Sequence, residues 1–121
     1  MYEFNCSLKK VVDADTIDLD IDLGFHNHII KRVVLEGIDA PEQFGPDASE
    51  AGKHASEFTK NWFANKIGGE FIYVSLSHNL LGNSGRVVWY PSGPKLIGGE
   101  RVLNHDLNDY CLLEFKDNRR P

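Results

Sequence analysis

The sequence lacks an excess of positive charge and any long apolar run. Its 18 acidic and 13 basic side chains give 121 residues a formal net charge of −5. A negative balance argues against tight binding along nucleic acid, because contacts to phosphates need Lys and Arg. No apolar stretch approaches the ~20 residues of a membrane-spanning helix, and the first residues do not resemble a signal peptide. We therefore expect a cytoplasmic chain that makes no membrane contact.

Cysteine is also scarce. Cys6 and Cys111 are too few for a disulfide framework, and neither lies in a Cys-x-x-Cys spacing, so we expect reduced thiols and no structural zinc site. What remains is an ordinary globular composition, 41% hydrophobic and 26% charged. A chain of this length buries roughly two-thirds of its unfolded surface. Without internal repeats or linker-like stretches, the sequence predicts a single domain over residues 1–121, and we expect a monomer.

Hydrophobic periodicity predicts five strands. Apolar and acidic residues alternate strictly over Ile17–Leu23, which is typical of a half-buried strand. The side chains of Asp18, Asp20 and Asp22 are expected on its solvent-facing side. The other predicted strands cover residues 3–12, 29–36, 70–77 and 86–90.

Two apolar stripes predict helices. The first helix is expected to begin after Asp47 as N-cap, with Glu50 completing a capping box, and to end at Gly68. The second is expected within residues 102–113. Five strands with a helix between the third and fourth is the layout of an OB-fold barrel. The sequence therefore predicts a mainly β fold with helices (α+β), built on a five-stranded OB-fold barrel. The first helical stripe consists of Ala51, Ala55, Phe58 and Trp62.

Two acidic residues precede the alternating strand. Carried backwards, the alternation places Asp13 and Asp15 on the same inward side as Ile17. A carboxylate near a core must be paired, protonated or bound to a cation, which makes Asp15 a candidate metal ligand. The pattern alone favours a different interpretation, in which Asp13 to Thr16 is a turn whose carboxylates bond to nearby backbone.

A second acidic group follows the third predicted strand, where Asp39 and Glu42 flank Ala40 and Pro41. Pro41 fixes the backbone and leaves the Ala40 carbonyl free to accept a hydrogen bond or to bind a cation. Calcium takes carboxylate and backbone carbonyl oxygens together, although a capped loop would use the same residues. Arg86 opens the fifth strand and is either a phosphate clamp or a surface arginine.

These segments together resemble the staphylococcal nuclease (thermonuclease) family, especially its short phage and bacterial members. The combination of Asp-x-Asp-Thr with Gly-Ile-Asp-Ala-Pro-Glu is specific, and the order and spacing match over most of the chain. The resemblance implies an OB barrel with helices, a Ca²⁺ cofactor, and hydrolysis of phosphodiester bonds in a DNA or RNA substrate. It is carried by Val11–Ile17, Arg32–Glu42, His54–Lys60 and Gly85-Arg86.

The resemblance also implies a calcium site. Asp15 and Asp39 match the family's calcium carboxylates, and Ala40 matches the position that lends its backbone carbonyl. Asp13 matches an acid that lies next to these ligands but does not bind the calcium ion itself. In this interpretation the positive ion offsets the repulsion between the two carboxylates.

The implied catalytic residues are Glu42, Arg86 and Arg32. Glu42 matches the carboxylate that activates or orients the attacking water, and Arg86 matches one of two arginines that hold the phosphate. The other arginine of the family is replaced here by Val34. Arg32 lies on the same strand face, roughly 6–7 Å along the strand, and would substitute only in part. Because losing one preorganised donor typically costs ~10²–10³ in rate, we expect a nuclease of reduced activity.

Two other functions would use the same residues. A chain that had lost catalysis would be an OB-fold module that binds nucleic acid or protein, as the replacement by Val34 would allow. A structural calcium-binding domain would need only the carboxylates. Retention of Asp15, Asp39, Glu42 and Arg86 together favours the enzyme.

Overall fold

Six strands and two helices make up the part of the chain that the computed structural model describes, residues 2–38, 40–41, 49–75, 83–91 and 99–115. The two-residue β6, directly before α2, is absent from the sequence prediction. In chain order the elements are β1 (Tyr2–Asp13), β2 (Thr16–Gly24), β3 (Asn27–Leu35), α1 (Glu50–Ala64), β4 (Glu70–Ser75), β5 (Ser84–Tyr90), β6 (Arg101–Val102) and α2 (Leu103–Phe115).

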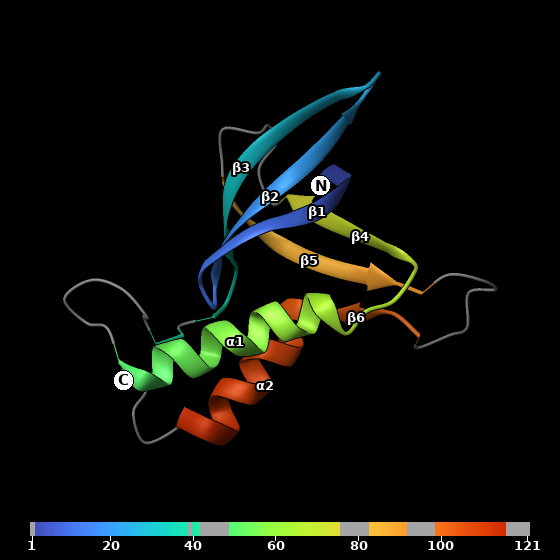
Figure 1. Cartoon of the computed structure of the whole chain (residues 1–121). Coiled ribbons are helices and arrows are strands. Elements are labelled where there is room, and N and C mark those ends of the chain that lie inside the picture. The colour runs from blue at the N-terminus through green and yellow to red at the C-terminus, as the bar shows by residue number, and fades with distance from the viewer. Residues whose placement is uncertain (1, 39, 42–48, 76–82, 92–98, 116–121) are drawn as a thin grey trace.

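The barrel closes because β3 pairs on both of its sides (Figure 1). β1, β2 and β3 form an antiparallel meander, and β1 continues through β4 to β5, again antiparallel. A short parallel pairing of Val34 with Ser84 and of Leu35 with Gly85 joins β3 to β5. The resulting order β1-β2-β3-β5-β4 is that of an OB-fold-like barrel, so the predicted five-stranded barrel is confirmed.

Alternate residues of the strands fill the barrel. Ile17, Leu19 and Ile21 of β2 are fully buried, and so are Tyr73 of β4 and Val87 of β5. The predicted alternation of β2 is therefore confirmed over this stretch. Removing apolar surface from water contributes ~25 cal/mol per Å², so this inward-facing set holds the register of the meander, since a shift by one residue would expose it.

Helix α1 begins two residues later than predicted. Ser49 is the N-cap, and its side chain accepts a hydrogen bond from the Gly52 N–H at 3.1 Å. The prediction of Asp47 as N-cap is therefore wrong, and Asp47 itself lies outside the described residues. Serine and aspartate are almost equally good caps, so the sequence could not separate the two positions.

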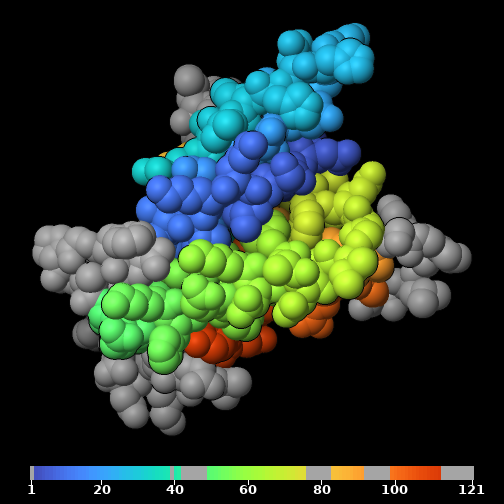
Figure 2. Space-filling view, viewed as in Figure 1, coloured from blue at the N-terminus to red at the C-terminus, as the bar shows by residue number. Residues whose placement is uncertain are grey.

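The two helices pack against each other beneath the barrel. Figure 2 shows α1, in green, lying along the strands, with α2, in red, on its other side. Ala55 and Trp62 of the predicted stripe are buried, and Phe58 stacks on Tyr110 of α2 with ring centroids 4.4 Å apart. Within the described ranges, neither helix is both long and apolar enough to cross a membrane.

The acidic side of β2 carries cross-strand pairs with β3. Asp18 accepts hydrogen bonds from the Arg32 guanidinium at 2.9 and 3.3 Å, and Asp20 lies 2.8 Å from the ring of His28. Asp22 accepts the Gly24 N–H at 2.8 Å as the hairpin turns. These three aspartates therefore serve the hairpin, in agreement with the predicted solvent-facing side.

Candidate functional site

A tight turn places Asp15 at one end of the barrel. Residues Ala14 and Asp15 connect β1 to β2, and Ala14 is fully buried. The Thr59 hydroxyl of α1 donates to the Ala14 carbonyl at 2.8 Å, and the Leu35 N–H of β3 donates to the Asp15 carbonyl at the same distance. The turn is thus held by a helix on one side and by the end of β3 on the other.

The predicted inward alternation does not continue through this turn. Thr16 pairs with Asp13 across it, and both Asp13 and Asp15 are half-buried, while Ala14 takes the fully buried place. The turn interpretation, which the pattern alone favoured, is therefore the correct local structure. A turn leaves the side chain of Asp15 at the barrel rim, where a ligand can approach it.

The Asp15 carboxylate reaches the segment that follows β3. Its two oxygens lie 3.4 Å from the Ala40 backbone N–H and 3.4 Å from the Thr16 hydroxyl, both of which donate to it. Burial raises the pKa of Asp15, these hydrogen bonds oppose the rise, and the nearby charge of Asp13 adds to it. A partly desolvated carboxylate beside another acid is a place where a cation would be favourable.

The residues at this end of the barrel fit a hard cation in their chemistry. Asp15, Asp13 and the backbone at Ala40 supply only oxygen ligands, which calcium prefers. The described part of the chain holds no cluster of three or more metal-ligating side chains. Asp39 and Glu42, which complete the predicted set, lie outside the described residues.

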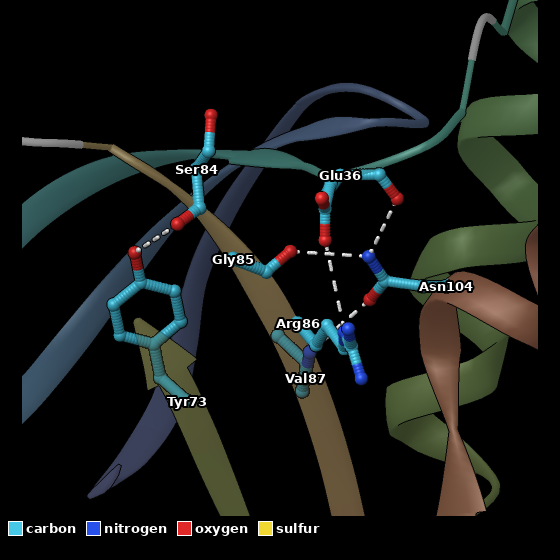
Figure 3. A network of polar contacts seen from close by, with 7 residues as sticks. All are labelled: Glu36, Tyr73, Ser84, Gly85, Arg86, Val87 and Asn104. Atoms are coloured by element: carbon cyan, nitrogen blue, oxygen red, sulfur yellow. Dashed lines mark hydrogen bonds and ion pairs between the residues drawn. The ribbon is translucent and has the colours of Figure 1, made fainter. Parts of the chain in front are cut away.

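Arg86 lies on the outer side of β5, next to the end of β3. Gly85 before it and Val87 after it are buried, whereas the Arg86 side chain is half-exposed. Its Nε is 3.8 Å from Oε2 of Glu36, the residue that directly follows β3. Figure 3 shows the two side chains pointing toward each other.

The seam between β3 and β5 is tied by Asn104 of α2 (Figure 3). Its buried amide donates to the carbonyls of Glu36 at 3.0 Å and Gly85 at 3.1 Å, and its oxygen accepts the Val87 N–H at 3.2 Å. A Cβ on Gly85 would overlap the ring of Tyr73 and the Val74 carbonyl, so only glycine permits this close approach. The backbone on both sides of Arg86 is therefore fixed.

The structure places Arg32 in a different environment from Arg86. Arg32 forms its two-pronged ion pair with Asp18 on the outer face of the hairpin. Val34, which stands where the resemblance would place a second arginine, pairs with Thr16 and Ser84 at the closure of the barrel. To take part in a phosphate clamp, Arg32 would have to give up the carboxylate that it already holds.

Glu36 and Asn104 are the site residues that the sequence did not single out for a role. The only sequence signal for Glu36 was an acid at the end of the predicted third strand, directly before Gly37. Asn104 had no partner visible in the sequence, because the groups to which its side-chain amide donates are 68 and 19 residues away.

No protein-family model matches this chain, and no curated protein is significantly similar to it.

The raised pKa of Asp15 predicts that Asp15→Asn stabilises the protein at neutral pH in the presence of a chelator. A carboxyl whose pKa is raised above its ordinary value of 3.8 by folding destabilises the native state as the pH rises through that raised pKa. The melting temperature of Asp15→Asn should exceed that of the wild type by a few degrees at pH 7, and the gap should close toward pH 3.

Asp18→Asn is the matched control. The hydrogen bonds from Arg32 lower the pKa of Asp18, so its ionised form stabilises the native state above pH 3.8 and the variant should melt at or slightly below the wild-type temperature at pH 7. Thermal unfolding at both pH values measures this. A destabilised Asp15→Asn at pH 7 would contradict the assigned environment.

Proposed function

We propose that this chain is a calcium-dependent nuclease that hydrolyses phosphodiester bonds in DNA or RNA. The observation that carries the proposal is that one short segment, Val34–Glu36, lies between an acidic and a basic group. The Leu35 N–H bonds to the Asp15 carbonyl, and the Glu36 N–H bonds to the Gly85 carbonyl at 2.9 Å, next to Arg86. A carboxylate and a guanidinium at one edge of a barrel suit a phosphate that bridges a cation and an arginine.

The calcium ligands of the proposal are the carboxylates of Asp15 and Asp39 and the carbonyl of Ala40. Asp13 would support them through its charge. When bound, Ca²⁺ would supply positive charge beside the phosphate oxygens. The hydrogen bond from the Ala40 N–H to Asp15 supports this grouping, because it shows that the segment after β3 returns to the Asp15 turn.

The remaining roles follow from the charge that develops during hydrolysis. Arg86 would bind a non-bridging phosphate oxygen, where negative charge grows in the transition state. Glu42 would orient a water molecule and accept its proton as the water oxygen bonds to phosphorus. The bond from phosphorus to the leaving oxygen breaks, and that oxygen takes a proton from solvent.

Two observations favour the rival proposal of an OB-fold module that binds nucleic acid or protein without cutting it. Val34 offers no donor at the position of the second family arginine, and Arg32 is engaged by Asp18. The nuclease proposal requires that Arg86 alone binds the phosphate well enough for cleavage. The rival proposal requires only binding.

The nuclease proposal predicts that purified protein cuts single-stranded DNA or RNA with calcium and stops when a chelator is added. Arg86→Ala should reduce the rate by about 10²–10³, because a preorganised donor is lost. Gel electrophoresis of end-labelled oligonucleotides measures both effects. If a folded preparation cuts no faster with calcium than in the chelated control, the chain is not a calcium-dependent nuclease.

Val34→Arg is expected to raise the cleavage rate by about tenfold or more, because it would add a second donor for the charge that develops on the phosphate. The register places residue 34 beside Ser84, two residues before Arg86 and on the same outer side of the seam. Ile30→Arg is the matched control, since it adds the same charge to the exposed outer face of β3 but away from this seam. An equal gain in both variants would show a general charge effect and no completion of the clamp.

A further inference from the structure

The ion pair between Glu36 and Arg86 is a feature that the proposed chemistry leaves unexplained. The carboxylate lies 3.8 Å from the guanidinium that would bind phosphate, and about half of each side chain is exposed, 48% and 45%. A solvated pair of this kind contributes little to stability. It does, however, put a negative charge where an anionic substrate would approach.

The backbone holds this arrangement in place. The Glu36 N–H bonds to the Gly85 carbonyl at 2.9 Å, and the Asn104 amide donates to the carbonyls of both residues. The Val87 N–H then bonds to the Asn104 oxygen. Figure 3 shows Glu36 and Arg86 projecting from the two strand ends that this amide joins. Glu36 can rotate its side chain, but its Cα stays beside Arg86.

A phosphate at Arg86 would therefore meet one positive and one negative side chain. The pair has no net charge, and Val34 adds none on the same outer side of the seam. The repulsion from Glu36 grows with the charge of the ligand. An internal phosphodiester carries a single negative charge, whereas a terminal phosphomonoester carries nearly two above its second pKa of about 6.

We propose that Glu36 makes the Arg86 site selective for singly charged phosphates, that is, for internal phosphodiester linkages over terminal phosphomonoesters. Glu36 is thus a specificity-determining residue that acts through Arg86. The inference rests on the proposed function, in which Arg86 binds the phosphate, and it narrows the substrate to linkages inside a strand.

Glu36→Gln tests the proposal through binding alone. The probes are a dinucleoside monophosphate, with one charge, and a nucleoside 5′-monophosphate, with two charges at pH 8, each titrated with calcium present and followed by NMR. The variant should bind the monophosphate about 4–10-fold more tightly and the dinucleoside about 2–3-fold more tightly, since exposed charge interactions are individually weak. Both gains should shrink at high salt.

The matched control is Glu57→Gln. It removes the same charge from an exposed ion pair with Lys60 on α1, so it changes the net charge of the protein equally. Glu57→Gln should leave the ratio of the two affinities unchanged. If Glu36→Gln also leaves that ratio unchanged, or binds both ligands more weakly, the proposal is wrong.

Cleavage kinetics separate this inference from the nuclease proposal. With oligonucleotides that carry a 5′-phosphate, Glu36→Gln should lower KM without lowering kcat, because the repulsion on the charge that grows in the transition state is relieved as well. A fall in kcat at constant KM would mean that Glu36 orients Arg86 for the reaction, which contradicts the proposal. If neither protein cuts but the affinity ratio shifts as expected, the selectivity of the site stands and the nuclease proposal fails. If the protein cuts with calcium but Glu36→Gln leaves the affinity ratio unchanged, the nuclease proposal stands and the selectivity proposal fails.

Discussion

The candidate site depends on backbone hydrogen bonds at the end of β3. The N–H groups of Val34, Leu35 and Glu36 donate alternately to the β5 side and to the Asp15 turn, at 2.8–2.9 Å. These bonds close the barrel, and they also bring an acidic turn and an arginine to the same three residues. Asp15 lies in the turn between β1 and β2, and neither of these strands pairs with β5, which carries Arg86, so β3 is the strand that connects the two groups. Fold and site therefore share one structural cause.

The distribution of negative charge follows from the same architecture. The alternation of β2 places Asp18, Asp20 and Asp22 on the outer face. There they form hydrogen bonds with Arg32, with His28 and with the hairpin backbone, respectively. Asp13 ends β1, Asp15 belongs to the turn that follows, and both are only half-buried. These five of the 18 acidic residues thus fall into two groups, three that stabilise the hairpin and two at the candidate site. An enzyme that clamps one phosphate has no need of the broad basic surface that tight binding along nucleic acid requires.

Much of the fold could be predicted because local patterns and barrel geometry agree. The alternation of β2 predicts one buried face, and the structure buries it from Ile17 to Ile21, while Leu23 is exposed near the hairpin turn. Ala55 and Trp62 of the predicted helical stripe are likewise buried. The pattern failed at Asp13 and Asp15, because a turn interrupts the period of two. It also could not reveal Glu36 beside Arg86 or the bonds of Asn104, since these depend on strand ends that meet only after the barrel closes. The roles of Asp39 and Glu42 remain predictions from the resemblance.

A calcium titration followed residue by residue in NMR spectra tests the central claim most directly. If the Asp15 turn and the segment after β3 form one cation site, the amide signals of Asp15 and Ala40 should shift together and saturate at one equivalent of calcium. Those of Phe25 and His26, at the hairpin tip, should stay in place. Saturable shifts confined to Asp18, Asp20 and Asp22, or no saturable shift at all, would contradict the account.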